Sequence, residues 1–245
     1  MNQLFYTTRI DDGFAYLEDE ESRHLQTVLR HKAGDSLQIT DGMGHIYEAV
    51  IAETGKKHTV AQIISTTVVE PERPYRLHVA IAPTKNMERY EWFLEKATEI
   101  GIDEITPLLC NHSERNTVRM DRMEKILVSA MKQSLRAYLP KLNPLTKFSD
   151  FIGAVKSPCK LIGWCGEEPK PHLYTQLAGQ TDITMLVGPE GDFSVEEVKE
   201  AAKQGFQGVT MGAIRLRTET AGLLVVSAAN MQSVYFNFKE GTNRH

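Results

Sequence analysis

The feature that most constrains the fold is an alternation of short apolar runs with helix-like segments, which continues from residue 77 onward. Each apolar run has the length of a buried strand, and the segments between them repeat apolar residues at helical spacing. The predicted strands are residues 77–82, 105–109, 161–164, 183–187 and 209–211, and the predicted helices are residues 87–100, 119–138, 194–204 and 218–236. Strands that alternate with helices form a parallel sheet covered on both faces. The sequence therefore predicts an α/β domain.

The first 70 residues show a different pattern. Residues 37–40 and 45–51 alternate in polarity around an Asp-Gly-Met-Gly turn, and residues 59–64 offer another strand. One helix, predicted over residues 22–32, interrupts these strands, and this arrangement favours a small β-barrel. Segment 70–74 carries two prolines and no periodicity, which is typical of a linker. We therefore expect one domain over residues 1–70 and a second over residues 71–245.

Charge and cysteine content exclude several classes of protein. The chain has 28 Lys and Arg against 32 Asp and Glu, so a nucleic-acid surface must be a local patch, and no DNA partner is expected. Its three cysteines lack CxxC spacing and its eight histidines lack ligand spacing, so no disulfide framework and no metal site is predicted. The first residues do not predict a signal peptide, and no apolar run approaches the roughly 20 residues that span a bilayer. We expect a cytoplasmic protein with no membrane partner.

The loop after the apolar run 183–187 is the first candidate for chemistry, because ligands of parallel sheets bind at the carboxyl ends of strands. It reads Gly-Pro-Glu-Gly-Asp-Phe from Gly188, and a Ser-Val-Glu-Glu capping box follows it. The two glycines permit close backbone approach to a flat ligand. An alternative is a strand-to-helix turn that needs glycine for steric reasons alone. Phosphate-loop, dinucleotide, nucleophile-elbow and zinc-helix motifs are absent.

A second candidate loop, residues 212–222, follows the predicted strand 209–211. Arg215 and Arg217 flank Leu216, as in an extended segment that points both arginines to one side. Thr218 or Thr220 can cap the following helix. The two arginines can also be read as surface residues that bridge to carboxylates.

Together these segments resemble the RsmE family. LVGPEGDFSVEE at 186–197, followed by RLRTETA at 215–221, is similar to that family's LVGPEGDFSxEE and LGxRILRxETA. The segments EKATEIG at 95–101, ITPL at 105–108 and QSLR at 133–136, and the N-terminal residues 24–35, extend the resemblance over essentially the whole chain. The chain departs from the pattern where Lys132 replaces Glu, where His112 replaces Arg, and where Met-Gly-Ala-Ile at 211–214 replaces LGxR.

The resemblance implies a SPOUT-class methyltransferase that uses S-adenosylmethionine to methylate N3 of a uridine in 16S rRNA of the small ribosomal subunit. It also implies an N-terminal PUA-like RNA-binding barrel and a trefoil knot formed by the loops after residues 161, 187 and 211. The implied cofactor-binding residues are Gly163, Leu186, Gly188, Gly191, Met211, Leu216, Thr218 and Ala221.

Uridine N3 carries a proton at neutral pH, so the site needs hydrogen-bond donors or cations beside the base. Arg217 is the first choice for this catalytic role, because it follows Leu216 at the cofactor site and keeps its charge. Arg215 and Arg115 are further candidates, and Glu190 or Glu219 can accept the proton.

Two basic clusters are candidates for RNA binding. Arg122, Lys125, Lys132 and Arg136 share one helical face, which Arg119 extends. Such a stripe is also typical of a merely solvated face. The second cluster lies in the acidic N-terminal region and consists of Arg9, Arg23, Arg30, His31 and Lys32.

Residues 220–238 contain no charge, so the last helix needs apolar cover on every face, and we expect a homodimer as in the family. Two alternatives for function remain open. One is a SPOUT enzyme that methylates a 2′-hydroxyl of tRNA or rRNA, and the other is a non-catalytic RNA-binding assembly factor.

Overall fold

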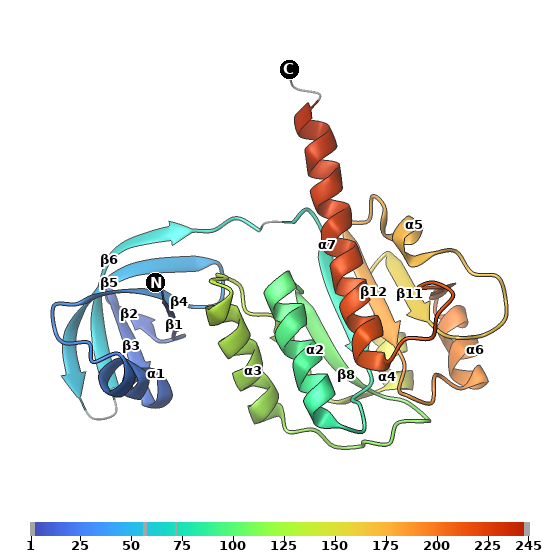
Figure 1. Cartoon of the computed structure of the whole chain (residues 1–245), viewed down its shortest axis with the longest axis horizontal. Helices are drawn as coiled ribbons and strands as arrows, with labels where there is room; N and C mark the ends of the chain where they lie inside the picture. The colour runs from blue at the N-terminus through green and yellow to red at the C-terminus, as the bar shows by residue number, and fades with distance from the viewer. Residues whose placement is uncertain (1–2, 56–57, 72, 243–245) are drawn as a thin grey trace. The chain divides into compact units, whose positions relative to one another are not determined.

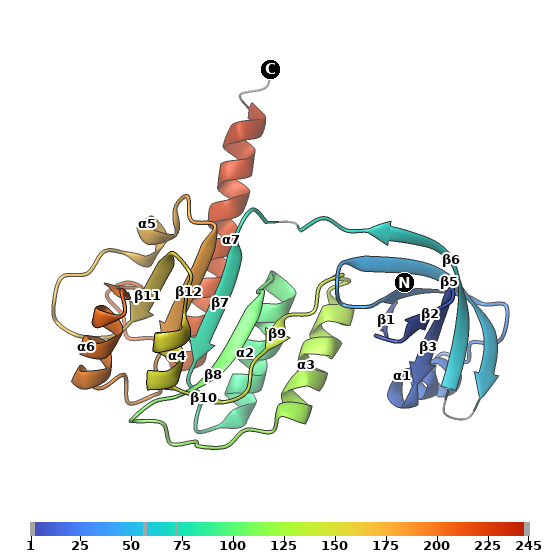
Figure 2. The same ribbon diagram turned by 180° about the vertical axis from the view of Figure 1, so that it is seen from behind.

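The computed structural model describes residues 3–55, 58–71 and 73–242, and the chain forms two compact units (Figures 1 and 2). The first unit contains residues 1–72 together with 128–139, and the second contains residues 73–127 and 140–245. The helix α3 (Met120–Gln133) therefore begins in the second unit and ends in the first.

The first unit is a six-stranded sheet in the order β1-β4-β5-β6-β3-β2. Its strands are β1 (Leu4–Tyr6), β2 (Ile10–Asp11), β3 (Phe14–Glu18), β4 (Ser36–Thr40), β5 (His45–Gly55) and β6 (His58–Val68). The pairs are antiparallel except β1 with β4. Alternate residues of these strands, among them Leu17, Ile39 and Ile51, are buried in one apolar cluster, which explains the polarity alternation in the sequence.

The sequence missed the first three strands of this unit. Between β2 and β3 the chain turns through Asp12 and Gly13, both with positive φ (44° and 77°). This is the backbone that a two-residue hairpin needs, and the Asp-Gly pair was the available signal for it.

The helix predicted over residues 22–32 is shorter and begins earlier. The chain forms α1 (Asp19–Arg23) and then one π-helical turn, η1 (His24–Val28). Gln26 holds this turn, because its side-chain amide donates to the carbonyl of Gly55 and to the hydroxyl of Ser22. Arg30 then takes a left-handed φ of 60° and ends the helical segment.

The second unit is a parallel sheet in the order β10-β8-β7-β12-β11-β13, with β9 beside β8. Its strands are β7 (Arg76–Ile81), β8 (Glu104–Leu109), β9 (Lys141–Leu142), β10 (Thr146–Lys147), β11 (Cys159–Gly163), β12 (Asp182–Val187) and β13 (Gln207–Val209). Its helices, apart from α3, are α2 (Met87–Ile100), α4 (Phe148–Ala154), α5 (Leu173–Leu177), α6 (Val195–Lys203) and α7 (Thr218–Thr242). The α/β prediction is confirmed.

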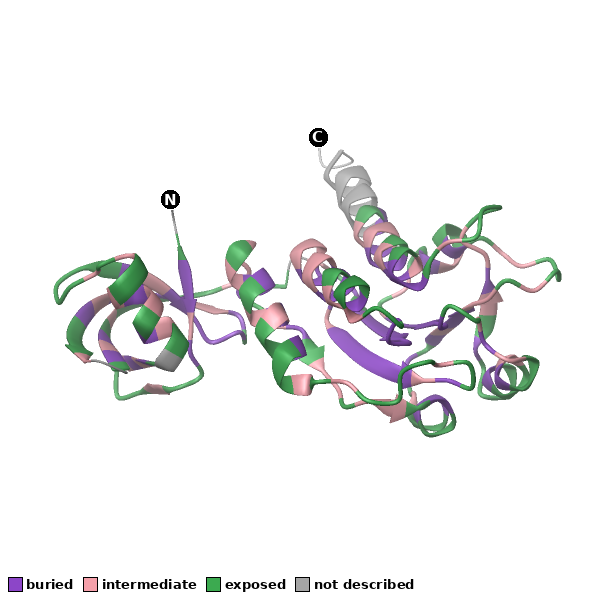
Figure 3. Ribbon diagram, turned by 60° about the horizontal axis from the view of Figure 1, so that its bottom comes forward, coloured by how far each residue is buried: buried purple, intermediate pink, exposed green. Residues whose placement is uncertain are grey.

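Helices cover this sheet on both faces. Helices α2 and α7 pack together on one face, and α4 and α6 lie on the other (Figures 1 and 2). The central strands are consequently almost fully buried, as Figure 3 shows, and Leu77, Val79 and Ile81 of β7 have no exposed surface. The knot implied by the resemblance stays a prediction.

Local signals located most helix ends in the second unit. Helix α2 spans the predicted residues and stops at Gly101, whose φ is 115°. Ser194 and Glu197 form the predicted capping box of α6. The predicted helix 119–138 is wrong at its end, because α3 stops at Gln133 and Leu135 takes a left-handed φ of 55°. No glycine marks that stop in the sequence.

Candidate active site

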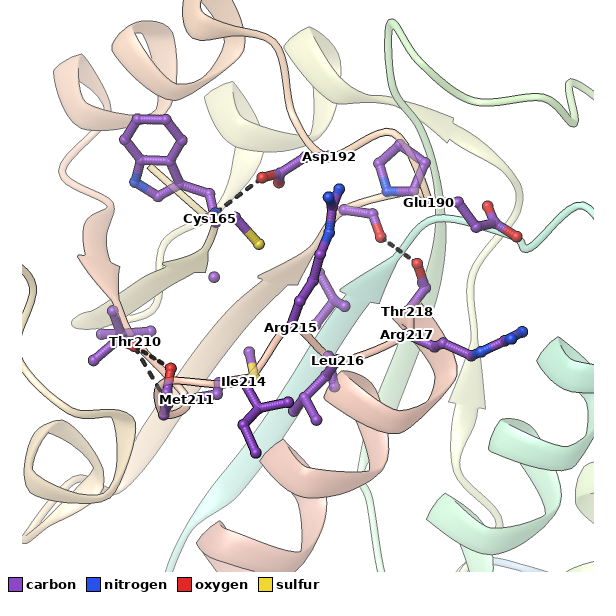
Figure 4. Close-up of a pocket in the computed structure, with 18 of the residues that line it drawn as sticks. Cys165, Glu190, Asp192, Thr210, Met211, Ile214, Arg215, Leu216, Arg217 and Thr218 are labelled. Atoms are coloured by element: carbon purple, nitrogen blue, oxygen red, sulfur yellow. Dashed lines mark hydrogen bonds between the residues drawn. The ribbon is translucent and has the colours of Figure 1, made fainter. Parts of the chain in front are cut away.

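A cavity of about 610 Å³ opens at the carboxyl ends of β11, β12 and β13 (Figure 4). Its walls are the loops that follow these three strands and the first turn of α7. The volume lies in the range of roughly 300–1,000 Å³ that is typical of small-molecule sites. Both candidate loops of the sequence, after residue 187 and after residue 211, meet here because parallel strands end at the same edge of the sheet.

Most of the predicted cofactor-binding residues line this cavity: Gly163, Gly188, Met211, Leu216, Thr218 and Ala221. Leu186 and Gly191 lie outside the lining. Leu186 is fully buried in the apolar core on the α4 and α6 face, and a Cβ on Gly191 would meet His112 at 3.0 Å. The direct contact of all eight with a cofactor stays a prediction.

Gly188 and Gly163 are glycines for different reasons. A Cβ on Gly188 would meet the ring of Phe193 at 3.1 Å and its backbone nitrogen at 3.3 Å, so a larger residue there would press on Phe193. A Cβ on Gly163 would meet the Met211 methyl at 2.6 Å and the Met185 methyl at 3.0 Å. Because Met211 also lines the cavity, Gly163 lets the two strand ends approach closely beside it.

The loop after β12 is fixed by hydrogen bonds to its backbone. The hydroxyl of Thr218, at the start of α7, donates to the carbonyl of Gly188 at 2.9 Å. Asp192 has a left-handed φ of 64°, and its carboxylate accepts from the amides of Cys165 at 2.9 Å and Phe193 at 2.8 Å. The three loops around the cavity are thereby held in one arrangement.

The two arginines of the last loop point in different directions, contrary to the prediction. Figure 4 shows Arg215 directed toward Cys165 and Asp192, whereas Arg217 extends toward the side of Glu190. Residues two apart share a side only in a regular strand, but β13 ends at Val209 and α7 starts at Thr218. Both arginines line the cavity, and the carboxylate bridges that the sequence left open are not formed among the described residues.

The two candidate proton acceptors also line the cavity. Glu190 accepts from the backbone amide of Lys85 at 2.8 Å. Glu219 is 8% exposed and lies in the first turn of α7, where the helix dipole stabilises a carboxylate. Its carboxylate faces Arg89 at 3.9 Å. Arg115 lies outside the lining, and its Nε donates to the carbonyl of Lys85 at 2.9 Å.

Sequence reasoning did not single out Arg89 or Lys170, which both line the cavity. Arg89 lies in the first turn of α2, after the carboxyl end of β7, so its position along the chain was the available signal. Lys170 donates to the carbonyls of Gly166 and Glu168 and lies over the ring of Trp164, 4.7 Å from its centre. No sequence signal brings Lys170 to this place.

Several predicted RNA-binding side chains have acidic partners. Arg9 pairs with Glu18 at 2.5 Å, Arg119 with Asp121 at 2.8 Å, and Arg122 with Glu91 at 2.6 Å. Arg136 also has an interaction partner. The exposed residues Arg23, Arg30 and Lys32 lie around η1 in the first unit. RNA binding by these residues stays a prediction.

Comparison with known protein families assigns the chain to one of them. The profile of a family described as "RNA methyltransferase domain" matches residues 71–230, which include every residue that lines the cavity. The chain belongs to this RNA methyltransferase family. A second profile, "RNA methyltransferase PUA domain", matches residues 17–64 of the first unit.

Relatives of this RNA methyltransferase cover nearly its whole length. "Ribosomal RNA small subunit methyltransferase E" of Buchnera aphidicola is 28% identical, over 92% of this chain and 90% of the relative. The crystal structure of a "probable rRNA-methyltransferase" from Porphyromonas gingivalis has a TM-score of 0.88 at 36% identity, and covers 96% of this chain and 99% of its own. Ribosomal RNA small subunit methyltransferase E from Neisseria gonorrhoeae, crystallised with S-adenosyl methionine, has a TM-score of 0.79 at 28% identity, over 94% and 98% of the two chains.

Among the described residues, no helix is long and apolar enough to cross a membrane, and no group of histidine, cysteine or carboxylate side chains is arranged to hold a metal ion.

Proposed function

We propose that this protein transfers a methyl group from S-adenosylmethionine to N3 of a uridine in 16S rRNA of the small ribosomal subunit. The observation that carries the proposal is the cavity at the ends of β11, β12 and β13, within the RNA methyltransferase match. Relatives named as small-subunit rRNA methyltransferases, one of them crystallised with S-adenosyl methionine, support the substrate and the cofactor.

The lining suits S-adenosylmethionine in shape and in chemistry. Val187, Met211 and Leu216 offer apolar surface to a flat ring, and Gly163 leaves the strand ends free of a Cβ. The lining carries both carboxylates, such as Glu190 and Asp192, and cations, such as Arg215, so it can match a ligand that carries charges of both signs. When bound, the cofactor supplies a methyl group that is already activated toward displacement.

The protein must then make uridine N3 nucleophilic. Arg217, exposed at the mouth of the cavity, stabilises the negative charge that spreads to the uracil oxygens when N3 loses its proton. Glu190 or Glu219 accepts that proton at a carboxylate oxygen. The rest of the rate enhancement comes from holding the methyl donor and uridine N3 in line, because the reaction is an in-line displacement.

The N-terminal domain, residues 1–70, is proposed to bind RNA through Arg9, Arg23, Arg30 and Lys32, as the match to an RNA methyltransferase PUA domain supports. Arg119, Arg122 and Arg136 of the second basic cluster are proposed to contact phosphates as well. A ribosomal RNA substrate also favours a cytoplasmic location.

A homodimer completes the proposal. Helix α7 buries Val225, Val226 and Ala229, yet it leaves Leu224 (36%) and Met231 (66%) exposed. These two are seven residues apart and so lie on one side of the helix. A second copy of the same helix is the proposed cover.

Nucleoside mass spectrometry of rRNA from a strain that lacks this gene tests the proposal. Loss of N3-methyluridine from 16S rRNA, restored by the wild-type gene, is the expected result. Loss of a 2′-O-methyl group instead would identify a different target atom, and an unchanged nucleoside profile would favour a non-catalytic assembly factor.

A further inference from the structure

Arg215 is a cation without a partner inside the cavity. Its guanidinium makes no hydrogen bond or ion pair with any other residue that the structure describes. Two other cations of the lining are engaged, because Lys170 donates to carbonyls and Arg89 faces Glu219. An unpaired guanidinium that points into a ligand cavity is a binding group for a planar anion, above all a carboxylate.

A carboxylate lies at the same end of the cavity. Asp192 is fixed by the backbone amides of Cys165 and Phe193, and Figure 4 shows Arg215 directed toward it. The Cys165 thiol lies close to both charges: burial and Asp192 raise its pKa, while Arg215 and Lys170 oppose that rise. One end of the cavity therefore holds a fixed carboxylate and a free guanidinium around a single cysteine.

We infer that this end binds the amino-acid moiety of S-adenosylmethionine, with Arg215 on the α-carboxylate and Asp192 on the α-ammonium group. The inference rests on the proposed function and adds how the cofactor is oriented. An α-amino acid end presents one anion beside one cation, and Arg215 and Asp192 offer the complementary pair. The apolar side chain of Met211, which Figure 4 shows away from Asp192, is left for the ring.

This assignment separates the two arginines of the loop. The RsmE pattern reads R-I-L-R where this chain reads Ile-Arg-Leu-Arg at 214–217, so Arg215 occupies the isoleucine position. Arg215 then serves cofactor selection, and Arg217, which points elsewhere, is left for the RNA base.

Calorimetry with S-adenosylmethionine and with decarboxylated S-adenosylmethionine tests the inference. Arg215→Ala should lower the affinity for S-adenosylmethionine by about 10-fold, which corresponds to the usual contribution of a charged hydrogen bond. The decarboxylated ligand has nothing for Arg215 to bind and carries more positive charge. Its affinity should stay the same or rise in Arg215→Ala, so the variant loses the preference of the wild type for the carboxylate.

Lys199→Ala is the control, since it removes an exposed positive charge of α6 that lies outside the cavity lining. It should change the affinity for either ligand by less than about threefold. Asparagine tolerates the left-handed backbone of residue 192. Asp192→Asn should therefore keep the loop and lower the affinity for both ligands by the same factor, because both retain the amine. Circular dichroism and melting temperatures confirm that each variant is folded.

Two results overturn the inference alone: wild type binds S-adenosylmethionine but Arg215→Ala binds it equally well, or Arg215→Ala weakens both ligands to the same extent. A folded wild-type protein with no measurable affinity for S-adenosylmethionine would instead overturn the proposed function, and the inference with it.

Discussion

At the scale of single residues, Arg217 is the side chain on which the proposed chemistry depends most. We predict that Arg217→Ala binds S-adenosylmethionine nearly normally but methylates small subunits on the order of 10²-fold more slowly, the usual cost of one electrostatic donor. Raising the pH should recover part of the rate, because more uridine is then already deprotonated. Single-turnover methylation from pH 7 to 9.5 measures both effects.

Arg115→Ala is the comparison for this variant, since Arg115 lies outside the cavity lining. A rate for Arg217→Ala within threefold of wild type, or a defect that high pH does not relieve, would assign the role to another residue.

His78 affects the stability of the fold rather than its chemistry. It is 8% exposed near the amino end of β7, packs edge-on against Phe151, and shares a 2.7 Å hydrogen bond with Thr106. Burial, assisted by Arg76 and Lys141 and opposed by Glu104 and Asp182, lowers the pKa of His78 to about 4. The unfolded chain, with a pKa near 6.5, binds the proton more readily than the folded one between these values.

Folding is therefore penalised as pH falls from about 6.5 to 4, and the loss contributed by His78 reaches about 3 kcal/mol. We predict that His78→Gln, which keeps a hydrogen-bonding group near Thr106, loses less stability than wild type over this range. Urea unfolding at pH 7, 5.5 and 4.5 gives the comparison. Parallel pH profiles for the two proteins would show that another group is responsible.

At the scale of elements, the glycines at the ends of β11 and β12 should respond differently to the same substitution. Gly163→Ala should weaken S-adenosylmethionine binding with little change in melting temperature, because the added methyl displaces the flexible Met211 side chain beside the cavity. Gly188→Ala should lower the melting temperature, because its methyl meets the buried Phe193 ring and backbone. Calorimetry and thermal unfolding of both variants measure the contrast.

This prediction is contradicted if the two glycine variants lose stability and affinity in the same proportion. The contact between position 188 and Phe193 also limits what a binding measurement on a Gly188 variant can show. Because the position is packed against Phe193, lost binding in Gly188→Val would reflect a disturbed loop rather than a blocked ligand.

At the scale of the whole molecule, the exposed side of α7 decides the oligomeric state. We predict a dimeric mass by light scattering at micromolar concentration, and a monomeric mass for Met231→Glu, because a charge would be buried in the proposed contact. Val195→Glu is a matched control, since Val195 is an exposed apolar residue of α6. A monomeric wild-type protein, or a dimeric Met231→Glu variant, would rule out this interface.

The sequence by itself determined the class of the second unit, its strands β7, β8, β11, β12 and β13, and most boundaries of the helices it predicted. It missed the short strands β9 and β10 and the helices α4 and α5. Buried parallel strands must be continuously apolar, and a capping box or terminal glycine marks a helix end locally, so these features are written in neighbouring residues. The loops after residues 187 and 211 were found in the same way, because strand ends of a parallel sheet gather at one edge.

Only the tertiary structure decided which side chains share the cavity and where they point. Arg215 and Arg217 diverge because a bend and a helix start separate them, and Lys170 reaches the cavity through its own loop. The end of α3 at Gln133 and the π-helical turn at His24–Val28 depend on backbone states and on partners distant in the chain, such as Gly55. Periodicity records which face of an element is buried, but side-chain direction in an irregular loop depends on contacts that form only when the strands assemble.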